Sequence, residues 1–183
     1  MKKDLPQRKH IRLRNYDYSL NGGYFITICT QNKRCVLSSI VGRGLIPTAE
    51  ERAVGRGLAP AEQECIIEYT ECGKIAEEQL QLLEKRYGGL TIDRYVIMPN
   101  HIHAIFIISD AAGASPRPTI MDIVCAYKSL TSRACKGKYA GNKLFQTSFY
   151  EHVIRGEEDY LHIAKYIDEN PLGWYYDELY TEN

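Results

Sequence analysis

Two histidines, His101 and His103, stand one residue apart inside the apolar stretch YVIMPNHIHAIFII, residues 95–108. If this stretch contains a β-strand, alternate side chains share a face, so both imidazoles point the same way. Two imidazoles on one face can share a divalent ion and leave positions open for substrate oxygens. In the alternative interpretation, both rings are partly buried and hydrogen-bonded to backbone carbonyl groups, without a metal.

A tyrosine and an amide follow at helical spacing in the stretch KYIDENP. Tyr166 and Asn170 are four residues apart and lie on one face of a helix. Because a tyrosine hydroxyl with a pKa of about 10 is a weak nucleophile, it needs an electrophile that a metal polarises. A metal-activated phosphodiester meets this need, and Asn170 could supply a third ligand oxygen. Alternatively, Tyr166 packs like most of the fourteen tyrosines and Asn170 only ends the helix before Pro171.

Tyr160 is the other tyrosine that this helix offers as a nucleophile. It precedes Tyr166 by six residues, so the two side chains cannot share a face of the helix. The residue four positions after Tyr160 is Ala164, which offers no polar partner. We therefore predict Tyr166 as the nucleophile.

Basic residues cluster in two segments that could contact phosphates. Residues 1–14 contain six Lys or Arg against one acid, and residues 128–143 contain basic residues without any acid. The candidate phosphate contacts are Arg12, Arg14, Lys128 and Arg155. For each of them a solvated surface is the alternative, and Arg155 could instead pair with a nearby carboxylate.

The elements that must position these residues follow from hydrophobic periodicity. The pattern predicts strands over 22–31, 90–98 and 101–109, and a final strand or extended segment over 143–155. It predicts helices over 71–87, 119–135 and 157–170. Thr119 and Asp122 are spaced as a helix-capping pair, and Pro171 ends the last helix. This order predicts an α+β fold, a ferredoxin-like βαββαβ antiparallel sheet with helices on one face and a C-terminal catalytic helix.

The length of 183 residues predicts one domain over residues 1–183. The pattern VGRGL-x-P occurs at 41–47 and again at 54–60, so we expect residues 41–62 to form an exposed insertion loop, or alternatively an arginine-bearing DNA contact. The six cysteines form no CxxC pair, and neither a signal peptide nor a membrane-spanning apolar run is present. We expect a reduced, cytoplasmic protein without a membrane partner.

Three motifs together resemble one known family. PNHIHAIF, YKSLTSRAC and FYEHVIRGEEDYLHIAKYIDENPLGW occur in this order and at suitable separations. They resemble the single-tyrosine HUH transposases of insertion sequences, and among these the REP-associated tyrosine transposases. The resemblance extends over nearly the whole chain and excludes only the insertion at 41–62.

The resemblance implies roles for four residues. His101 and His103 match the histidines that hold Mg²⁺ or Mn²⁺, Asn170 matches a third ligand, and Tyr166 matches the nucleophile. It implies cleavage and rejoining of single-stranded DNA beside hairpins through a 5′-phosphotyrosine intermediate, by a monomer or a homodimer. A binding module that recognises hairpin DNA or RNA without cutting it is the alternative function. A histidine-dependent nucleotide hydrolase is a third possibility. It would be expected to have another alternating histidine at position 105, and the residue there is Ile105, which counts against it.

Overall fold

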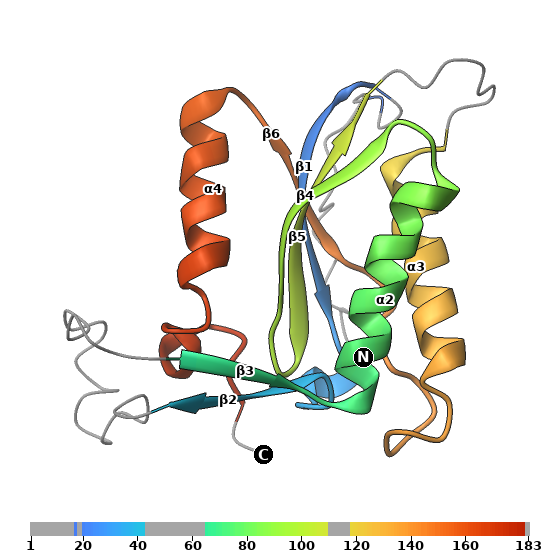
Figure 1. The fold of residues 1–183 in the computed structure, drawn as a ribbon, viewed down its shortest axis with the longest axis vertical. Helices are drawn as coiled ribbons and strands as arrows, with labels where there is room; N and C mark the ends of the chain where they lie inside the picture. The colour runs from blue at the N-terminus through green and yellow to red at the C-terminus, as the bar shows by residue number, and fades with distance from the viewer. Residues whose placement is uncertain (1–16, 18–19, 43–64, 110–117, 182–183) are drawn as a thin grey trace, which may run out of the picture.

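The computed structural model describes residues 17, 20–42, 65–109 and 118–181 (Figure 1). Its elements are β1 (Gly22–Cys29), η1 (Gln31–Lys33), β2 (Ser38–Gly42), β3 (Cys65–Tyr69), α2 (Glu71–Arg86), β4 (Leu90–Ile97), β5 (His101–Ile108), α3 (Ile120–Ala134), β6 (Tyr150–Ile154), α4 (Glu157–Glu169) and η2 (Trp174–Tyr176). Within these ranges, no helix combines the length and the apolar character that crossing a lipid bilayer requires. The predicted phosphate contacts Arg12 and Arg14 and most of the predicted insertion, from residue 43 on, lie outside the described residues.

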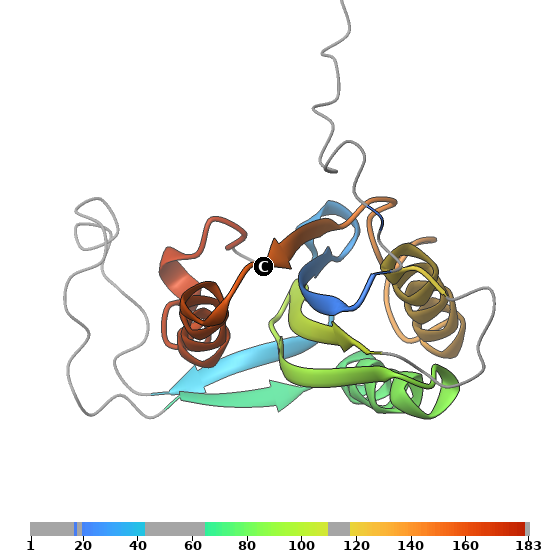
Figure 2. The ribbon, with the colours of Figure 1, turned by 90° about the horizontal axis from the view of Figure 1, so that it is seen from above.

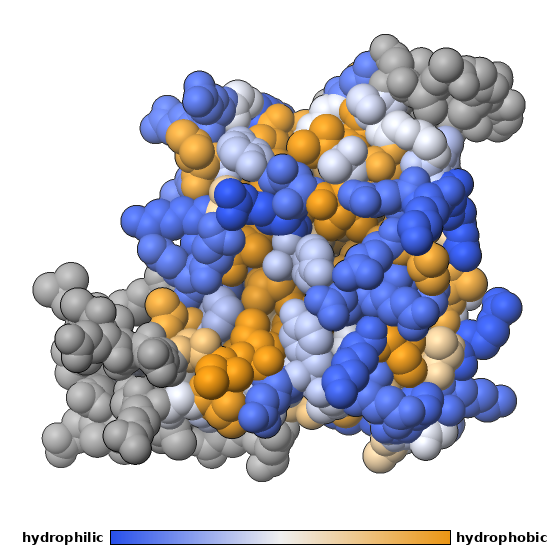
Figure 3. Space-filling model, viewed as in Figure 1, coloured by the Kyte–Doolittle hydropathy of each residue, from blue (hydrophilic) through white to orange (hydrophobic). Residues whose placement is uncertain are grey.

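The main sheet has four antiparallel strands in the order β4-β5-β1-β6. Helices α2 and α3 cover one face of this sheet, and α4 covers the other (Figures 1 and 2). The predicted α+β arrangement, with a ferredoxin-like sheet and a separate C-terminal helix, is therefore confirmed. Hydrophobic residues reach the surface seen in Figure 3 mainly between α4 and α2, where the sheet lies.

Strand β5 lies in the interior of this sheet and is buried on both faces. Its even-numbered side chains, from Ile102 to Ile108, join the core beneath α2 and α3. Its odd-numbered side chains face α4, where Ile105 packs with Ile163 and Ile167 of that helix. Because side chains alternate along a strand, this register turns both histidines toward α4.

Helices α2 and α3 each begin at a threonine whose side chain accepts a hydrogen bond from the first turn. Thr70 accepts a hydrogen bond from the Gly73 amide at the start of α2, and Thr119 forms a reciprocal capping box with Asp122 at the start of α3. Helix α4 follows Gly156, whose φ of 91° favours glycine, and three acidic residues occupy its first turn.

Two segments differ from the sequence prediction. Residues 38–42 and 65–69 pair as a second, two-stranded sheet, so that Val41 and Gly42 belong to β2 rather than to the predicted loop. The last strand is shorter than the predicted 143–155 and spans only Tyr150–Ile154. Hydrophobic periodicity missed the hairpin because the strand β3 alternates between partly buried and exposed positions and has no fully buried residue.

The backbone of Leu37 connects the hairpin to the segment that carries the histidines. Its amide donates to the Pro99 carbonyl at 3.0 Å, directly before Asn100, and its own carbonyl accepts from the Thr70 amide at 3.0 Å. Gly73 of α2 lies against this carbonyl, and a Cβ atom added there would stand 2.0 Å from the Leu37 oxygen. The close approach of α2 therefore helps to fix the β4–β5 turn.

We expect Gly73→Ala to destabilise the protein by about 3 kcal/mol, because the added methyl group overlaps a backbone carbonyl that is itself held in place. Helix propensity alone predicts the opposite sign, a gain of roughly 0.5–1 kcal/mol. Urea denaturation measures the difference, and the exposed neighbour Lys74→Ala serves as a control that should change stability by less than about 0.5 kcal/mol. A Gly73→Ala protein as stable as the wild type would contradict this packing.

Candidate functional site

The structure brings His101, His103, Tyr166 and Asn170 together on the face of the sheet that α4 covers. Both histidines are fully buried, and their ring centroids are 4.4 Å apart. The Tyr166 hydroxyl lies 3.3 Å from His103 Nε2. Asn170 follows the last residue of α4 and is 2% exposed.

Neighbouring strand β1 fixes the ring of His103. Thr27 is its cross-strand partner, and the Thr27 hydroxyl lies 2.9 Å from His103 Nδ1. The ring of Phe25, two residues along the same strand, stacks on His103 with centroids 5.2 Å apart and meets Tyr166 edge-on at 6.1 Å. One nitrogen of His103 is thus occupied by Thr27, and the other faces the tyrosine.

His101 is held by different groups. Its Nδ1 lies 2.8 Å from Asn100 Oδ1. The ring of the buried Trp174 has its centroid 5.9 Å from the centroid of the His101 ring. Its Nε2 is buried and makes no hydrogen bond of normal geometry within the described residues. The same is true of Asn170 Oδ1, while Asn170 Nδ2 donates to Asp177 Oδ2 at 3.1 Å.

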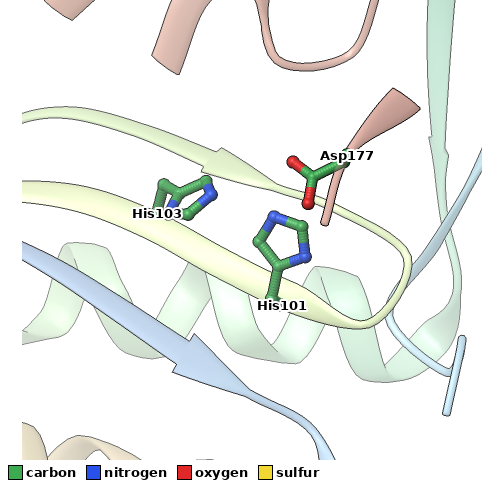
Figure 4. Close-up of side chains that lie close together, drawn as sticks. All are labelled: His101, His103 and Asp177. Carbon is green, nitrogen blue, oxygen red and sulfur yellow. The ribbon is translucent and has the colours of Figure 1, made fainter. Parts of the chain in front are cut away.

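Asp177 is a site residue that the sequence analysis did not predict. Its carboxylate and the ring nitrogens of His101 and His103 offer ligand atoms that lie within 4.8 Å of one another (Figure 4). It follows the short helix η2 and belongs to a segment without a recognisable motif. The only signal in the sequence is an acid a few residues after the Pro171 helix stop, and such acids are common on solvated tails.

Burial controls the charge of both histidines. It lowers the pKa of His101 to about 4, and the nearby Asp177 carboxylate and Asn170 amide offset this effect only in part. Burial, followed by the neighbouring His101, also holds the pKa of His103 well below its usual value. Both rings are therefore neutral at pH 7, and a neutral imidazole has a lone pair that can bind a metal.

The donor set fits a divalent cation. A buried imidazole nitrogen of His101 and a buried amide oxygen of Asn170 both lack a hydrogen-bond partner among the described residues, and a carboxylate stands beside them. Buried polar groups without partners are costly, and these groups are ones that coordinate metal ions. A cation between them would satisfy the lone pairs that the protein itself leaves unpaired.

The remaining predicted residues lie away from this cluster. Lys128 belongs to α3, on the opposite face of the sheet, and its Nζ donates to the Thr147 carbonyl at 2.8 Å. Arg155 is exposed just before α4, and its backbone amide donates to Asp159. Tyr160 donates to Asp93 of β4 at 2.7 Å, and thus makes its contact with the edge strand β4.

Comparisons with known proteins find similarity both in sequence and in structure. No family model matches the chain. An uncharacterized protein of Haemophilus influenzae is 31% identical over 195 aligned positions, which cover 97% of this chain and 96% of that protein. The solved structure of a REP-associated tyrosine transposase bound to a REP hairpin superposes with a TM-score of 0.54 at 20% identity, over 88% of this chain and 72% of that one. The structural likeness establishes the fold, in agreement with the resemblance seen in the motifs.

We expect the metal-free protein to lose stability as the pH falls from 6.5 toward 4. In this range His101 is protonated in the unfolded chain but stays neutral in the folded chain. Lowering the pH therefore favours unfolding. The loss between pH 7.5 and 4.5 should be about 2–3 kcal/mol from His101 alone, measured by denaturation in EDTA. His101→Gln should reduce this dependence, and the part that the buried His103 contributes should remain. A His101→Gln protein with the wild-type dependence would contradict the buried, neutral ring.

Proposed function

Because this chain belongs to one family with the Haemophilus influenzae protein and has the fold of the REP-associated tyrosine transposase, we propose that it is a transposase-like enzyme acting on DNA. In this proposal it cleaves and rejoins single-stranded DNA beside a hairpin. The observation that carries the proposal is one cluster of chemical groups. The Tyr166 hydroxyl contacts His103, one of two neutral, buried histidines, and oxygens of Asn170 and Asp177 lie in the same cluster as possible metal ligands. Support for a hairpin substrate comes from the neighbour in structure, which is bound to a REP hairpin.

His101, His103, Asn170 and Asp177 are the residues that would hold a divalent ion, Mg²⁺ or Mn²⁺. When bound, such an ion polarises a phosphate of the DNA and stabilises the charge that develops during transfer. We expect Mn²⁺ to bind more tightly than Mg²⁺, because Mg²⁺ prefers a shell made only of oxygens and two of these donors are nitrogens.

Tyr166 is the proposed nucleophile. Its oxygen forms a bond to phosphorus and loses its proton, while the bond from phosphorus to the 3′-oxygen breaks and that oxygen gains a proton. The products are a 5′-phosphotyrosine and a free 3′-hydroxyl, so the phosphodiester energy is kept and no ATP is required. The rings of Phe25 and His103 both pack edge-on with the Tyr166 ring, and this packing orients the hydroxyl before DNA arrives.

We expect a covalent protein–DNA adduct when the protein is mixed with Mn²⁺ and a hairpin oligonucleotide labelled at its 3′ end, its sequence taken from the DNA beside the gene. Attack at the scissile phosphate leaves the labelled fragment on the tyrosine, and denaturing electrophoresis detects it. Tyr166→Phe should abolish the adduct, and EDTA should do the same. Tyr160→Phe is the matched control and should retain it, because that hydroxyl bonds to Asp93.

The result that would overturn cleavage is binding without an adduct. If wild type and Tyr166→Phe bind the hairpin equally and neither forms a covalent product with either ion, the non-cleaving binding module is the correct function.

Asp177→Asn should reduce adduct formation at low Mn²⁺ by about tenfold or more, because a charged ligand becomes neutral at the proposed metal site. Raising the Mn²⁺ concentration should restore much of the rate, since the defect lies in ion binding. The same treatment should not rescue Tyr166→Phe. Loss of activity in Asp177→Asn that no concentration of Mn²⁺ restores would argue against Asp177 as a ligand.

A further inference from the structure

The side chain of Asn100 lies at the centre of a buried hydrogen-bond network. Asn100 is fully buried in the turn between β4 and β5, immediately before His101. Its Oδ1 lies 2.8 Å from His101 Nδ1. Its Nδ2 donates to the Leu179 carbonyl at 2.7 Å, the Lys33 carbonyl at 3.2 Å and the Thr181 hydroxyl at 3.2 Å.

The surroundings of Asn100 permit only one orientation of its amide. Two of the atoms near its nitrogen, the carbonyls of Lys33 and Leu179, can only accept hydrogen bonds. A flipped amide would place its own oxygen against both of them. The NH₂ group therefore faces the two carbonyls, and the amide oxygen faces His101.

This orientation determines which nitrogen of His101 carries the proton. An amide oxygen can only accept, so Nδ1 of the neutral His101 ring must be the protonated nitrogen that donates to Asn100. The lone pair then resides on Nε2, the buried atom that has no partner within the described part of the chain. Asn100 thus keeps His101 in the one neutral form that can bind an ion on the side of Asp177.

The same amide group holds the C-terminal segment that carries Asp177. Leu179 and Thr181 both accept from Asn100, and the Leu179 amide donates to Asp177 Oδ1 at 2.6 Å. Lys33 adds a second connection, because its Nζ donates to the Glu178 carbonyl at 3.1 Å. The carboxylate therefore belongs to a segment that Asn100 attaches to the β4–β5 turn.

The backbone of η1 supports this arrangement at a conformational cost. Asn32 and Lys33 have φ angles of 59° and 52°, in the left-handed region that few residues other than glycine adopt. This conformation presents the Lys33 carbonyl to both Asn100 Nδ2 and the Thr181 hydroxyl, at 3.2 and 2.9 Å. The Asn100 carbonyl in turn accepts from the Thr30 amide at 2.8 Å.

We propose that Asn100 is a positioning residue with two linked tasks: it sets the tautomer of His101, and it holds the segment that delivers Asp177 to the site. The consequence for metal binding rests on the proposed function, whereas both tasks can be measured without any metal.

The first experiment reads the tautomer directly in metal-free protein labelled with ¹⁵N-histidine, by two-bond ¹H–¹⁵N correlation spectra at pH 7.5. Wild type should show His101 protonated at Nδ1. Asn100→Ala should convert the ring to a mixture or to the Nε2-protonated form. Asn100→Asp should keep the wild-type tautomer, because a carboxylate also accepts from Nδ1.

The second experiment separates the task at the C-terminal segment. Hydrogen exchange of the amides at 177–181 should accelerate at least tenfold in Asn100→Asp, because the new oxygen repels the Lys33 and Leu179 carbonyls. Thr181→Val should accelerate the same amides and leave the His101 tautomer unchanged.

The third measurement is the affinity for Mn²⁺ by calorimetry. Asn100→Ala should weaken binding about 10–100-fold, as the loss of a group that orients a metal ligand does. Tyr127→Phe is the matched control. It also removes a buried hydrogen bond, from its hydroxyl to the Ala76 carbonyl on the opposite face of the sheet, and should change neither the tautomer nor the affinity.

The proposal is overturned if Asn100→Ala keeps the wild-type tautomer, or if 177–181 exchange at the wild-type rate in Asn100→Asp. If wild-type protein binds no Mn²⁺, the proposed metal site fails, and the tautomer and exchange measurements still decide the role of Asn100. Should Asn100→Ala not fold, the wild-type spectrum tests the first task, because a His101 ring protonated at Nε2 would overturn it, and Asn100→Asp and Thr181→Val test the second.

Discussion

The burial of strand β5 on both faces is the constraint on which the site depends. One face must be apolar because it contributes to the core beneath α2 and α3, and Ile102 and Phe106 meet this need. The other face is closed by α4, and two imidazoles are placed there instead of aliphatic side chains. Burial without an acidic partner strong enough to charge them keeps both rings neutral.

Neutral rings in a closed layer leave lone pairs that need partners. Thr27 and Asn100 occupy the Nδ1 atoms of His103 and His101, so that only the Nε2 atoms remain for chemistry. At His103 the Tyr166 hydroxyl contacts this nitrogen, whereas at His101 it has no partner among the described residues. The proposed nucleophile and the proposed ion therefore require the same atom of His103. An ion that binds His103 Nε2 would therefore displace the Tyr166 hydroxyl from that nitrogen.

The sequence predicted the parts of the structure that local patterns determine. The spacing of His101 and His103 on a strand, and of Tyr166 and Asn170 on a helix, followed from periods of two and of about 3.6 residues. Asp177 could not be found in this way, because its place in the site depends on contacts between the C-terminal segment and a turn about 80 residues earlier in the chain.

The proposed positioning role of Asn100 was also not predictable from the sequence. An asparagine after proline ordinarily indicates a turn, and only the two carbonyls that surround its amide reveal that it orients His101. The hairpin of β2 and β3 was missed for a related reason. Its strands are short and only partly buried, so its pairing depends on residues that are distant in the sequence.

The most direct test of the central claim is a crystal of this protein grown with Mn²⁺ and measured for anomalous scattering near the manganese edge. We expect one anomalous peak next to the Nε2 atoms of His101 and His103, with oxygens of Asn170 or Asp177 completing the shell. Crystals that bind Mn²⁺ only elsewhere, with the Tyr166 hydroxyl still on His103, would contradict it.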